Sequence, residues 1–229
     1  MIIDIFLPCR SSSQRIKNKN IKKFSSKKFG LFELKISQLV LVKNIRNVIV
    51  STNDKKIIQY LIKLNHEKII IDKRKKHLCS SKTKTDTLIK YVSKITDAQH
   101  ILWTHVTSPF FDNIDYDKSI DVYKKNIKKN DSLMGVSRVQ EFIYDKKQPI
   151  NFNKNKEKWP RTQTLKKLFV VNNAIFINSR KNYIKHKDRI GTKPYLMEID
   201  KIKSFDVDWP HDFSIAENIY ESIFKKNSK

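Results

Sequence analysis

The order of apolar runs along the chain constrains its fold more than any other feature. Short runs rich in β-branched and aromatic residues predict buried strands at residues 2–8, 47–51, 68–71, 100–106, 131–136 and 169–178. Apolar residues at helical spacing predict helices within 22–44, after Asp54, near residues 88–95, at 114–128 and at 210–224. Strands that alternate with helices require crossover connections. The pattern therefore predicts an α/β fold, Rossmann-like, with a mostly parallel sheet between helices.

The first predicted strand opens directly into a polar, basic loop. The loop carries Arg10, Ser11, Ser12, Ser13, Gln14, Arg15, Lys17, Lys19 and Asn20. In α/β proteins such a loop lies at the carboxyl edge of the sheet, where ligands bind. Backbone N–H groups, hydroxyls and fixed cations suit an anion such as a nucleotide triphosphate. A plain solvated basic face stays open as the alternative, because the loop lacks the glycine that most phosphate loops use.

Two carboxylates, Asp206 and Asp208, lie two positions apart near the C-terminal end of the chain. On an extended segment both would point to one side, about 7 Å apart. Mg²⁺ binds through one or two carboxylates together with substrate phosphates, so the pair is a candidate metal site. The alternative is that Asp208 caps the helix predicted to begin near Pro210, with Asp212 facing the helix dipole.

Residues 137–167 interrupt the rhythm of strands and helices. The stretch is polar, contains Pro149 and Pro160, and is too long for an ordinary connection. It also carries four aromatic residues that need burial, Phe142, Tyr144, Phe152 and Trp159. It is either an active-site flap or an arm exchanged between subunits. We expect one domain over residues 1–229, with 137–167 as an inserted arm.

The net charge of +25 does not by itself indicate a nucleic-acid-binding protein. The lysines are scattered along the whole chain, whereas a dedicated nucleic-acid-binding surface concentrates charge on one face and interleaves aromatic residues with it. We expect non-specific binding of polyanions at low salt only. A basic nucleic-acid-binding protein remains the rival from a different functional class.

No apolar stretch approaches the roughly 20 residues that span a membrane. Asp4 and Pro8 interrupt the only candidate signal sequence. The two cysteines, Cys9 and Cys79, have no metal-ligand spacing, which favours free thiols. We therefore expect a cytoplasmic protein without a membrane segment.

Six motifs, taken in order, resemble those of the acylneuraminate cytidylyltransferase family, which activates sialic acid and related nonulosonic acids as CMP-sugars. They are residues 10–21 (RSSSQRIKNKNI), 51–54 (STND), 105–109 (HVTSP), 159–163 (WPRTQ), 172–178 (NNAIFIN) and 206–217 (DVDWPHDFSIAE). The resemblance runs from Ile2 to about Tyr220. It implies the fold of nucleotide-diphospho-sugar transferases with an inserted dimerisation arm.

The resemblance also implies roles for individual residues. Catalysis would rest on Arg10, Lys19 and Asp208. CTP would be bound by Arg10, Ser13, Gln14, Arg15, Lys19, Asn20 and Arg74. The sugar would contact His105, Thr107, Ser108, Arg161, Gln163, Asn172 and Phe176. Asp206 and Asp208 would hold Mg²⁺ or Mn²⁺.

The implied reaction transfers CMP from CTP to a nonulosonic acid and releases pyrophosphate. The implied assembly is a homodimer in which the arm, with Arg161, reaches the sugar site of the neighbouring subunit. Two other enzyme-related readings stay open. One is a nucleotidyltransferase for an octulosonic acid, and the other is an inactive homologue, because Ser12 and Gln14 stand where the family usually has glycine and lysine.

Overall fold

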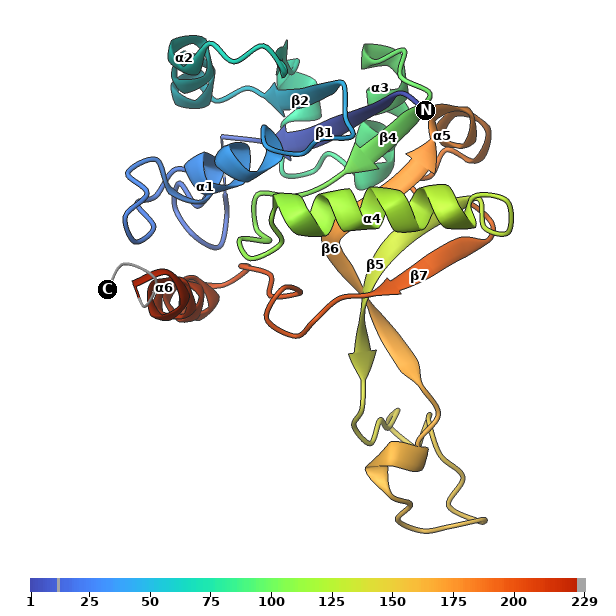
Figure 1. The fold of residues 1–229 in the computed structure, drawn as a ribbon. Coiled ribbons are helices and arrows are strands. Elements are labelled where there is room, and N and C mark those ends of the chain that lie inside the picture. Colours follow the sequence, from blue (N-terminus) through green and yellow to red (C-terminus); the bar gives the residue numbers. More distant parts are fainter. Residues whose placement is uncertain (12, 226–229) are drawn as a thin grey trace.

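Seven strands form one sheet in the order β3-β2-β1-β4-β6-β5-β7 (Figure 1). This computed structural model describes residues 1–11 and 13–225, so Ser12 lies outside the described residues. The strands are β1 (Ile3–Cys9), β2 (Asn47–Thr52), β3 (Ile69–Lys73), β4 (His100–Trp103), β5 (Ser132–Val139), β6 (Leu168–Ser179) and β7 (Pro194–Glu198). The helices are α1 (Gly30–Leu39), α2 (Lys55–Leu64), α3 (Thr85–Ile95), α4 (Asn113–Asn126), α5 (Arg180–His186) and α6 (Pro210–Lys225).

The first half of the sheet is parallel. β1 pairs in parallel with β2 and with β4, and β2 pairs in parallel with β3. The mostly parallel α/β fold predicted from the sequence is confirmed. The prediction for the fourth strand was too long, because β4 ends at Trp103. The backbone N–H of Thr104 donates to the carbonyl of Phe6 at 3.2 Å, and its hydroxyl donates to the carbonyl of Ala174 at 2.8 Å.

The second half of the sheet mixes both directions. β6 runs antiparallel to β4 and to β5, whereas β7 is parallel to β5. The sequence pattern predicted neither α5 nor β7. Tyr183 is the buried residue of the seven-residue α5, and β7 alternates half-buried and exposed positions at the edge of the sheet. Neither segment has enough apolar residues to produce a recognisable period.

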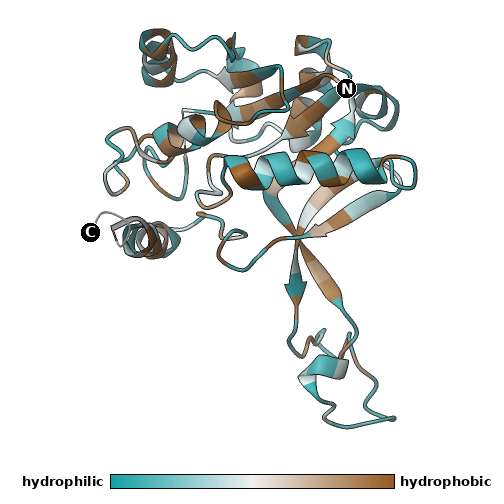
Figure 2. Ribbon diagram, viewed as in Figure 1, coloured by the Kyte–Doolittle hydropathy of each residue, from teal (hydrophilic) through white to brown (hydrophobic). Residues whose placement is uncertain are grey.

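Helices cover both faces of the sheet and enclose two hydrophobic clusters. The larger cluster joins β1 and β2 to α1, α2, α4 and α6. The smaller cluster lies on the other face, where α3 and α5 cover Phe6, Trp103 and Phe176. The central strands are accordingly the most hydrophobic part of the ribbon (Figure 2).

Side-chain caps fix where two of the helices begin. Asp54 accepts a hydrogen bond from the backbone N–H of Lys56 and starts α2, as its position in the sequence predicted. Asp112 and Asp115 form a reciprocal capping box at the start of α4. Such caps satisfy backbone donors that a helix cannot pair internally.

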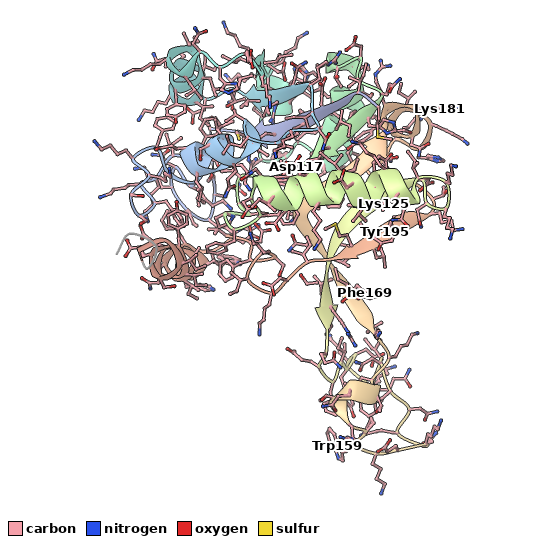
Figure 3. The ribbon with its side chains drawn as sticks, in the orientation of Figure 1. Asp117, Lys125, Trp159, Phe169, Lys181 and Tyr195 are labelled. Carbon is pink, nitrogen blue, oxygen red and sulfur yellow. The ribbon has the colours of Figure 1, made fainter. Side chains whose placement is uncertain are left out.

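The chain between β5 and β6 projects away from the body of the molecule (Figure 1). β5 and β6 stay paired as they leave the body, with Val139 opposite Leu168. Beyond them the aromatic side chains contact one another. Phe142 packs edge-on against Phe152 and Trp159, at centroid distances of 5.2 and 5.5 Å. Trp159 stands near the end of this projection (Figure 3) and is 69% exposed.

The C-terminal helix α6 packs on the long loop that follows β1. Phe24 contacts Phe213 and Tyr220 edge-on, and Glu217 accepts a hydrogen bond from the backbone N–H of Ser25 at 2.6 Å. Gly30 ends this loop with a φ of +68°, and a Cβ there would lie 2.1 Å from the carbonyl oxygen of Lys22. These contacts bring the chain preceding α6 against the first loop.

Candidate functional site

A pocket lies at the carboxyl edge of β1 and β4. Its lining comes from the first loop and from the residues after β4: Pro8, Arg10, Ser13, Gln14, Arg15, Lys19, Asn20, His105, Val106 and Thr107. The six residues of the first loop for which a role in CTP binding was predicted therefore all face one pocket. Three of them are cations, so the pocket suits an anionic ligand.

Hydrogen bonds to neighbouring backbone give the first loop its shape. Asn53, which follows β2, accepts from the backbone N–H of Ser11 at 3.0 Å and donates to the Ser11 hydroxyl at 3.1 Å. Asn20 donates from its side-chain amide to the carbonyl of Arg10 at 3.2 Å. The two ends of the loop are thereby tied to each other and to the neighbouring strand, and its cations are held at the pocket.

Lys19 and Arg15 meet Asp208 at the border of the pocket. Nζ of Lys19 donates to the carbonyl of Val207 at 2.7 Å and lies 3.4 Å from Oδ1 of Asp208. Nη1 of Arg15 lies 2.9 Å from Oδ2, and its guanidinium also stacks 5.0 Å from the ring centroid of Trp209. Burial raises the pKa of Asp208, but the hydrogen bond from Arg15 and the charge of Lys19 outweigh it, so the pKa lies below its ordinary value.

Asp212, and not Asp208, supports the backbone at the start of α6. Oδ2 of Asp212 accepts from the backbone N–H groups of Asp208 and Trp209, at 3.0 and 2.6 Å. The alternative in which Asp208 caps the helix is therefore wrong, because its carboxylate faces Lys19 and Arg15. The Arg15 and Asp208 side chains are each 45% exposed, so their ion pair contributes little to stability.

Asp206 lies two residues before Asp208, and one of its carboxylate oxygens has no partner among the described residues. Oδ2 accepts from the side-chain amide of Asn173 at 3.2 Å, while Oδ1 is buried with no hydrogen-bond partner among the described residues. In the part of the chain that the structure describes, no three His, Cys, Asp or Glu side chains cluster into a metal site of their own. The free oxygen of Asp206 and the carboxylate of Asp208 fit an ion such as Mg²⁺ that takes its other ligands from a substrate.

His105 is held as a neutral imidazole. Nε1 of Trp103 donates to Nε2 of His105 at 2.9 Å. Burial, together with the charges of Arg189 and Lys19, lowers the pKa of His105 to about 3. Because Nε2 accepts, the proton of the neutral ring is on Nδ1, which makes His105 a hydrogen-bond donor.

The residues after His105 join the pocket to the carboxylate segment. The carbonyl of Thr107 accepts from the backbone N–H of Val207 at 2.9 Å, which ties the pocket wall to the residue between Asp206 and Asp208. Ser108 is almost fully buried, and its hydroxyl has no hydrogen-bond partner among the described residues.

The structure places Asn172 and Phe176 in the framework behind the pocket. The side-chain amide of Asn172 donates to the carbonyl of Ser204 at 2.6 Å and accepts from the backbone N–H of Ala174 at 2.8 Å. Phe176 is 1% exposed and belongs to the smaller hydrophobic cluster. Neither residue lines the pocket, so their contact with a sugar stays a prediction.

Arg74 also lies outside the pocket lining. It is 5% exposed, and its guanidinium donates to the hydroxyl of Ser51 at 2.9 Å and to the carbonyl of Ser51. Burial lowers the pKa of this guanidinium. In this structure Arg74 supports the end of β2, and its contact with a cytosine base stays a prediction.

Arg161 and Gln163 belong to the projecting segment. Both are exposed, and they lie at a short 3-10 turn (Thr162–Thr164) that is held by the Thr164 N–H donating to the Arg161 carbonyl at 2.9 Å. The structure does not bring them to the pocket of their own chain.

Three side chains near the site were not singled out from the sequence. Asn53 holds the first loop, Asn173 binds Asp206, and Arg189 stacks on the ring of Phe176. Asn53 and Asn173 lie within the motifs at residues 51–54 and 172–178, but neither residue was given a role. Arg189 had no signal, because it lies in a stretch with no predicted element.

Comparison with known proteins explains this arrangement. The family model described as cytidylyltransferase matches residues 5–228. The chain belongs to the cytidylyltransferase family. The resemblance noted in the sequence is thereby confirmed at the level of the family, and the match includes the first loop, the residues after β4 and the two carboxylates near α6.

Curated relatives carry a more specific name. The chain is 25% identical over 216 residues to an N-acylneuraminate cytidylyltransferase of Streptococcus agalactiae serotype III (strain NEM316). It has the same identity to the protein of that name from serotype V (strain ATCC BAA-611 / 2603 V/R). Each alignment covers 90% of this chain and 50% of the relative. The chain thus spans about half the length of the curated relatives it matches.

Solved structures share the fold at low identity. A CMP:2-keto-3-deoxy-manno-octonic acid synthetase, complexed with CTP, superposes with a TM-score of 0.68 at 12% identity, covering 98% of this chain and all of the other. A 4-diphosphocytidyl-2C-methyl-D-erythritol synthase from Anaerococcus prevotii DSM 20548 superposes with a TM-score of 0.69 at 13% identity, with 96% of both chains covered.

Among the described residues, no helix is long and apolar enough to cross a membrane.

Proposed function

We propose that this chain transfers CMP from CTP to a nonulosonic acid, an N-acylneuraminate or a relative, and releases pyrophosphate. The single observation that carries the proposal is that Arg10, Arg15 and Lys19 converge on one pocket whose border is formed by Asp208. The names of the curated relatives support the choice of acceptor.

The cations of the first loop have the role of binding the triphosphate. Arg10 and Lys19 neutralise the pyrophosphate as it leaves, and Ser13 and Asn20 supply hydrogen bonds. The neutral side chain of Gln14 does not leave the pocket short of charge, because Arg15 lines it at the next position. This arrangement argues against an inactive homologue.

The proposal includes Mg²⁺, or Mn²⁺, held by Asp206 and Asp208 together with oxygens of the nucleotide. Such an ion supplies charge neutralisation at the α-phosphate when bound. The buried oxygen of Asp206 without a partner among the described residues supports this assignment, and Asp208 follows it two residues later in the same segment. Asn173 and Thr107 orient the two carboxylates through the contacts described above.

The reaction itself is a displacement at the α-phosphate. The anomeric hydroxyl of the sugar forms a bond to that phosphorus, the bond to the pyrophosphate oxygen breaks, and the hydroxyl proton passes to solvent. Positioning and charge neutralisation supply most of the catalysis in such transfers. His105 donates a hydrogen bond from Nδ1 and is not the base, since Nε2 already accepts from Trp103.

Assembly completes the proposal. Tyr144, Ile150 and Trp159 are 41, 51 and 69% exposed on the projecting segment. A second copy of the chain would cover these side chains, and exchange of identical elements is a common route to two-fold dimers. We therefore include a homodimer in which Arg161 and Gln163 reach the sugar site of the other subunit.

Release of pyrophosphate tests the proposed function. The purified chain is incubated with CTP, Mg²⁺ and one acid at a time, namely N-acetylneuraminate, further nonulosonic acids and an octulosonic acid. We expect release with at least one nonulosonic acid and none without an acid. Release with the octulosonic acid alone would favour the rival enzyme. Failure of every acid in the panel to cause release would contradict the proposal.

A further inference from the structure

Arg189 has an unusual position between α5 and β7. Its Cζ lies 3.8 Å from the ring centroid of Phe176 and 5.7 Å from that of Trp103. Both rings belong to strands next to the pocket, and Arg189 itself is half-buried. A guanidinium at this distance stacks flat on a ring and keeps the N–H groups at its edge available for other contacts.

In the described part of the chain Arg189 forms no ion pair, although the charge of the adjacent Asp188 acts on it. No carboxylate forms an ion pair with Arg189 and no described oxygen accepts a hydrogen bond from it. The neighbouring carboxylate of Asp188 accepts instead from the backbone N–H of Ile190. Arg46, by contrast, contacts both Asp4 and Asp97, and Lys203 contacts Asp112 and Asp115. A half-buried charge without a partner is costly, and a bound anion or acceptor relieves the cost.

His105 connects Arg189 to the pocket. Trp103, one of the two rings beneath Arg189, donates to His105, and His105 lines the pocket. The charges of Arg189 and Lys19 both act on the His105 imidazole. The pocket is therefore within the electrostatic reach of Arg189, while Arg10, Arg15 and Lys19 already supply the cations for a triphosphate.

We propose that Arg189 is a specificity-determining residue that binds an oxygen acceptor of the sugar acid, either its carboxylate or an acyl carbonyl. This inference rests on the proposed function and names the part of the substrate that Arg189 selects. The planar fork of an arginine suits both groups, and stacking on Phe176 fixes its orientation. An acceptor sugar that lacks the oxygen leaves the cation unpaired and binds more weakly.

Steady-state kinetics of three variants test this role. Arg189→Leu removes the charge and keeps an apolar contact with Phe176, and Arg189→Lys keeps the charge without the planar fork. Lys185→Leu is the matched control, because Lys185 is exposed on the nearby α5. KM and kcat are measured separately for the acid and for CTP, and the melting temperature of each variant is recorded.

We expect Arg189→Leu to raise the KM of the acid by about tenfold or more, the usual effect of losing a hydrogen bond to a charged group. The KM of CTP should change less than about twofold. Arg189→Lys should recover part of the loss, and Lys185→Leu should behave as the wild type. A lowered melting temperature with an unchanged KM for the acid would overturn the inference, since it would make Arg189 a packing residue only.

Acceptor analogues separate the two possible oxygens. If Arg189 binds the carboxylate, the wild type prefers the acid over its carboxamide, and Arg189→Leu loses this preference. If it binds the acyl carbonyl, the preference lost is that for the N-acylated sugar over the free amine. If the wild type is active and Arg189→Leu keeps both preferences, the role of Arg189 is overturned but the proposed function is not. A wild type that uses no acid overturns the proposed function and this inference together.

Discussion

The pocket and the projecting segment both carry groups without partners, but of opposite kinds. In the pocket these groups are cations: Arg10 forms no ion pair with the described residues, and Lys19 and Arg15 share one carboxylate, Asp208. In the segment the groups without partners are apolar, because Trp159 is exposed and the nearby rings of Phe142 and Phe152 pack against each other. Cations gathered in a pocket indicate a small anionic ligand, whereas exposed aromatic rings indicate a protein surface.

The largest expected effect tests the pocket. Asp208→Asn should lower kcat by about a hundredfold or more, since it removes a carboxylate that is proposed to hold Mg²⁺ at the transferred phosphate. The melting temperature should change little, because Asp212 and not Asp208 supports the start of α6. Asp121→Asn on the exposed face of α4 is the matched control and should be fully active. Retention of most activity by Asp208→Asn would remove Asp208 from the site.

The choice of nucleotide is the next largest effect. We expect kcat/KM for CTP to exceed that for UTP by about five- to 150-fold, because each polar group left unpaired by the wrong base costs about 1–3 kcal/mol. Asn20, which lines the pocket, is the proposed contact for the base. Competition between CTP and UTP in one reaction measures the ratio directly. Equal use of the two nucleotides would contradict selection at the base.

The projecting segment predicts a smaller change that depends on assembly. A chain carrying Arg161→Ala and a chain carrying Asp208→Asn should each be inactive. Mixing them should restore about a quarter of the wild-type activity, since half of randomly mixed dimers are hybrids with one intact site of two. The rate after subunit exchange, confirmed with differently tagged chains, measures the recovery.

Two results would contradict the proposed role of the projecting segment in assembly. One is a monomer at micromolar concentration by light scattering, and the other is confirmed exchange without recovery of activity. Trp159→Asp should also weaken the dimer, whereas Ile114→Asp should not, although Ile114 on α4 is similarly exposed. Equal effects of the two substitutions would show that the segment has no special role.

Lys35, a buried cation on α1, gives the smallest effect. Lys35 is fully buried, and its Nζ donates to the carbonyl of Phe111 at 2.7 Å and to the hydroxyl of Tyr116 at 3.1 Å. Burial lowers the pKa of Lys35 to about 7, although the carboxylates of Asp112 and Asp115 partly oppose the shift. Unlike the pocket cations, this one is satisfied within the fold.

The sign of the pH dependence follows from that pKa. Below pH 7 Lys35 is charged in both the folded and the unfolded chain, so the cost of burying the charge is present in full. Between pH 7 and the ordinary pKa of a lysine the unfolded chain binds more protons, so the stability contributed by this site rises with pH, by at most about 1.4 kcal/mol per unit. The melting temperature of the wild type should therefore rise relative to that of Lys35→Met as the pH is raised from 6 to 9. Parallel curves would contradict it.

The central strands of this fold could be predicted from the sequence because buried strands contain runs of consecutive apolar residues. Residues 5–7 and residues 48–50 are continuous apolar runs, and they lie in the paired parallel strands β1 and β2. β7 and α5 escaped prediction because each lies at the edge and buries few side chains. The direction of β6 could not be read from its apolar residues, since a buried strand has the same composition in either direction.

The site was predictable in part for a different reason. The first loop and the two carboxylates were found as local patterns, and the resemblance to a family joined them. The contact between Lys19 and Asp208 spans 189 positions and depends on how Phe24 packs against α6, which no local pattern contains. Residues 204–208 are held by Asn172 and Thr107, and that also is a tertiary result.

The most direct test of the central claim is the stoichiometry of the reaction. Wild-type chain is incubated with CTP, Mg²⁺ and the best acid of the panel, and pyrophosphate and the CMP-linked sugar are quantified together by mass spectrometry. We predict one CMP-sugar for each pyrophosphate, with neither product formed when the acid is omitted and both formed about a hundredfold more slowly when Asp208→Asn replaces the wild type. Pyrophosphate formed without a CMP-sugar, or no product with any acid, would contradict transfer of CMP by this pocket.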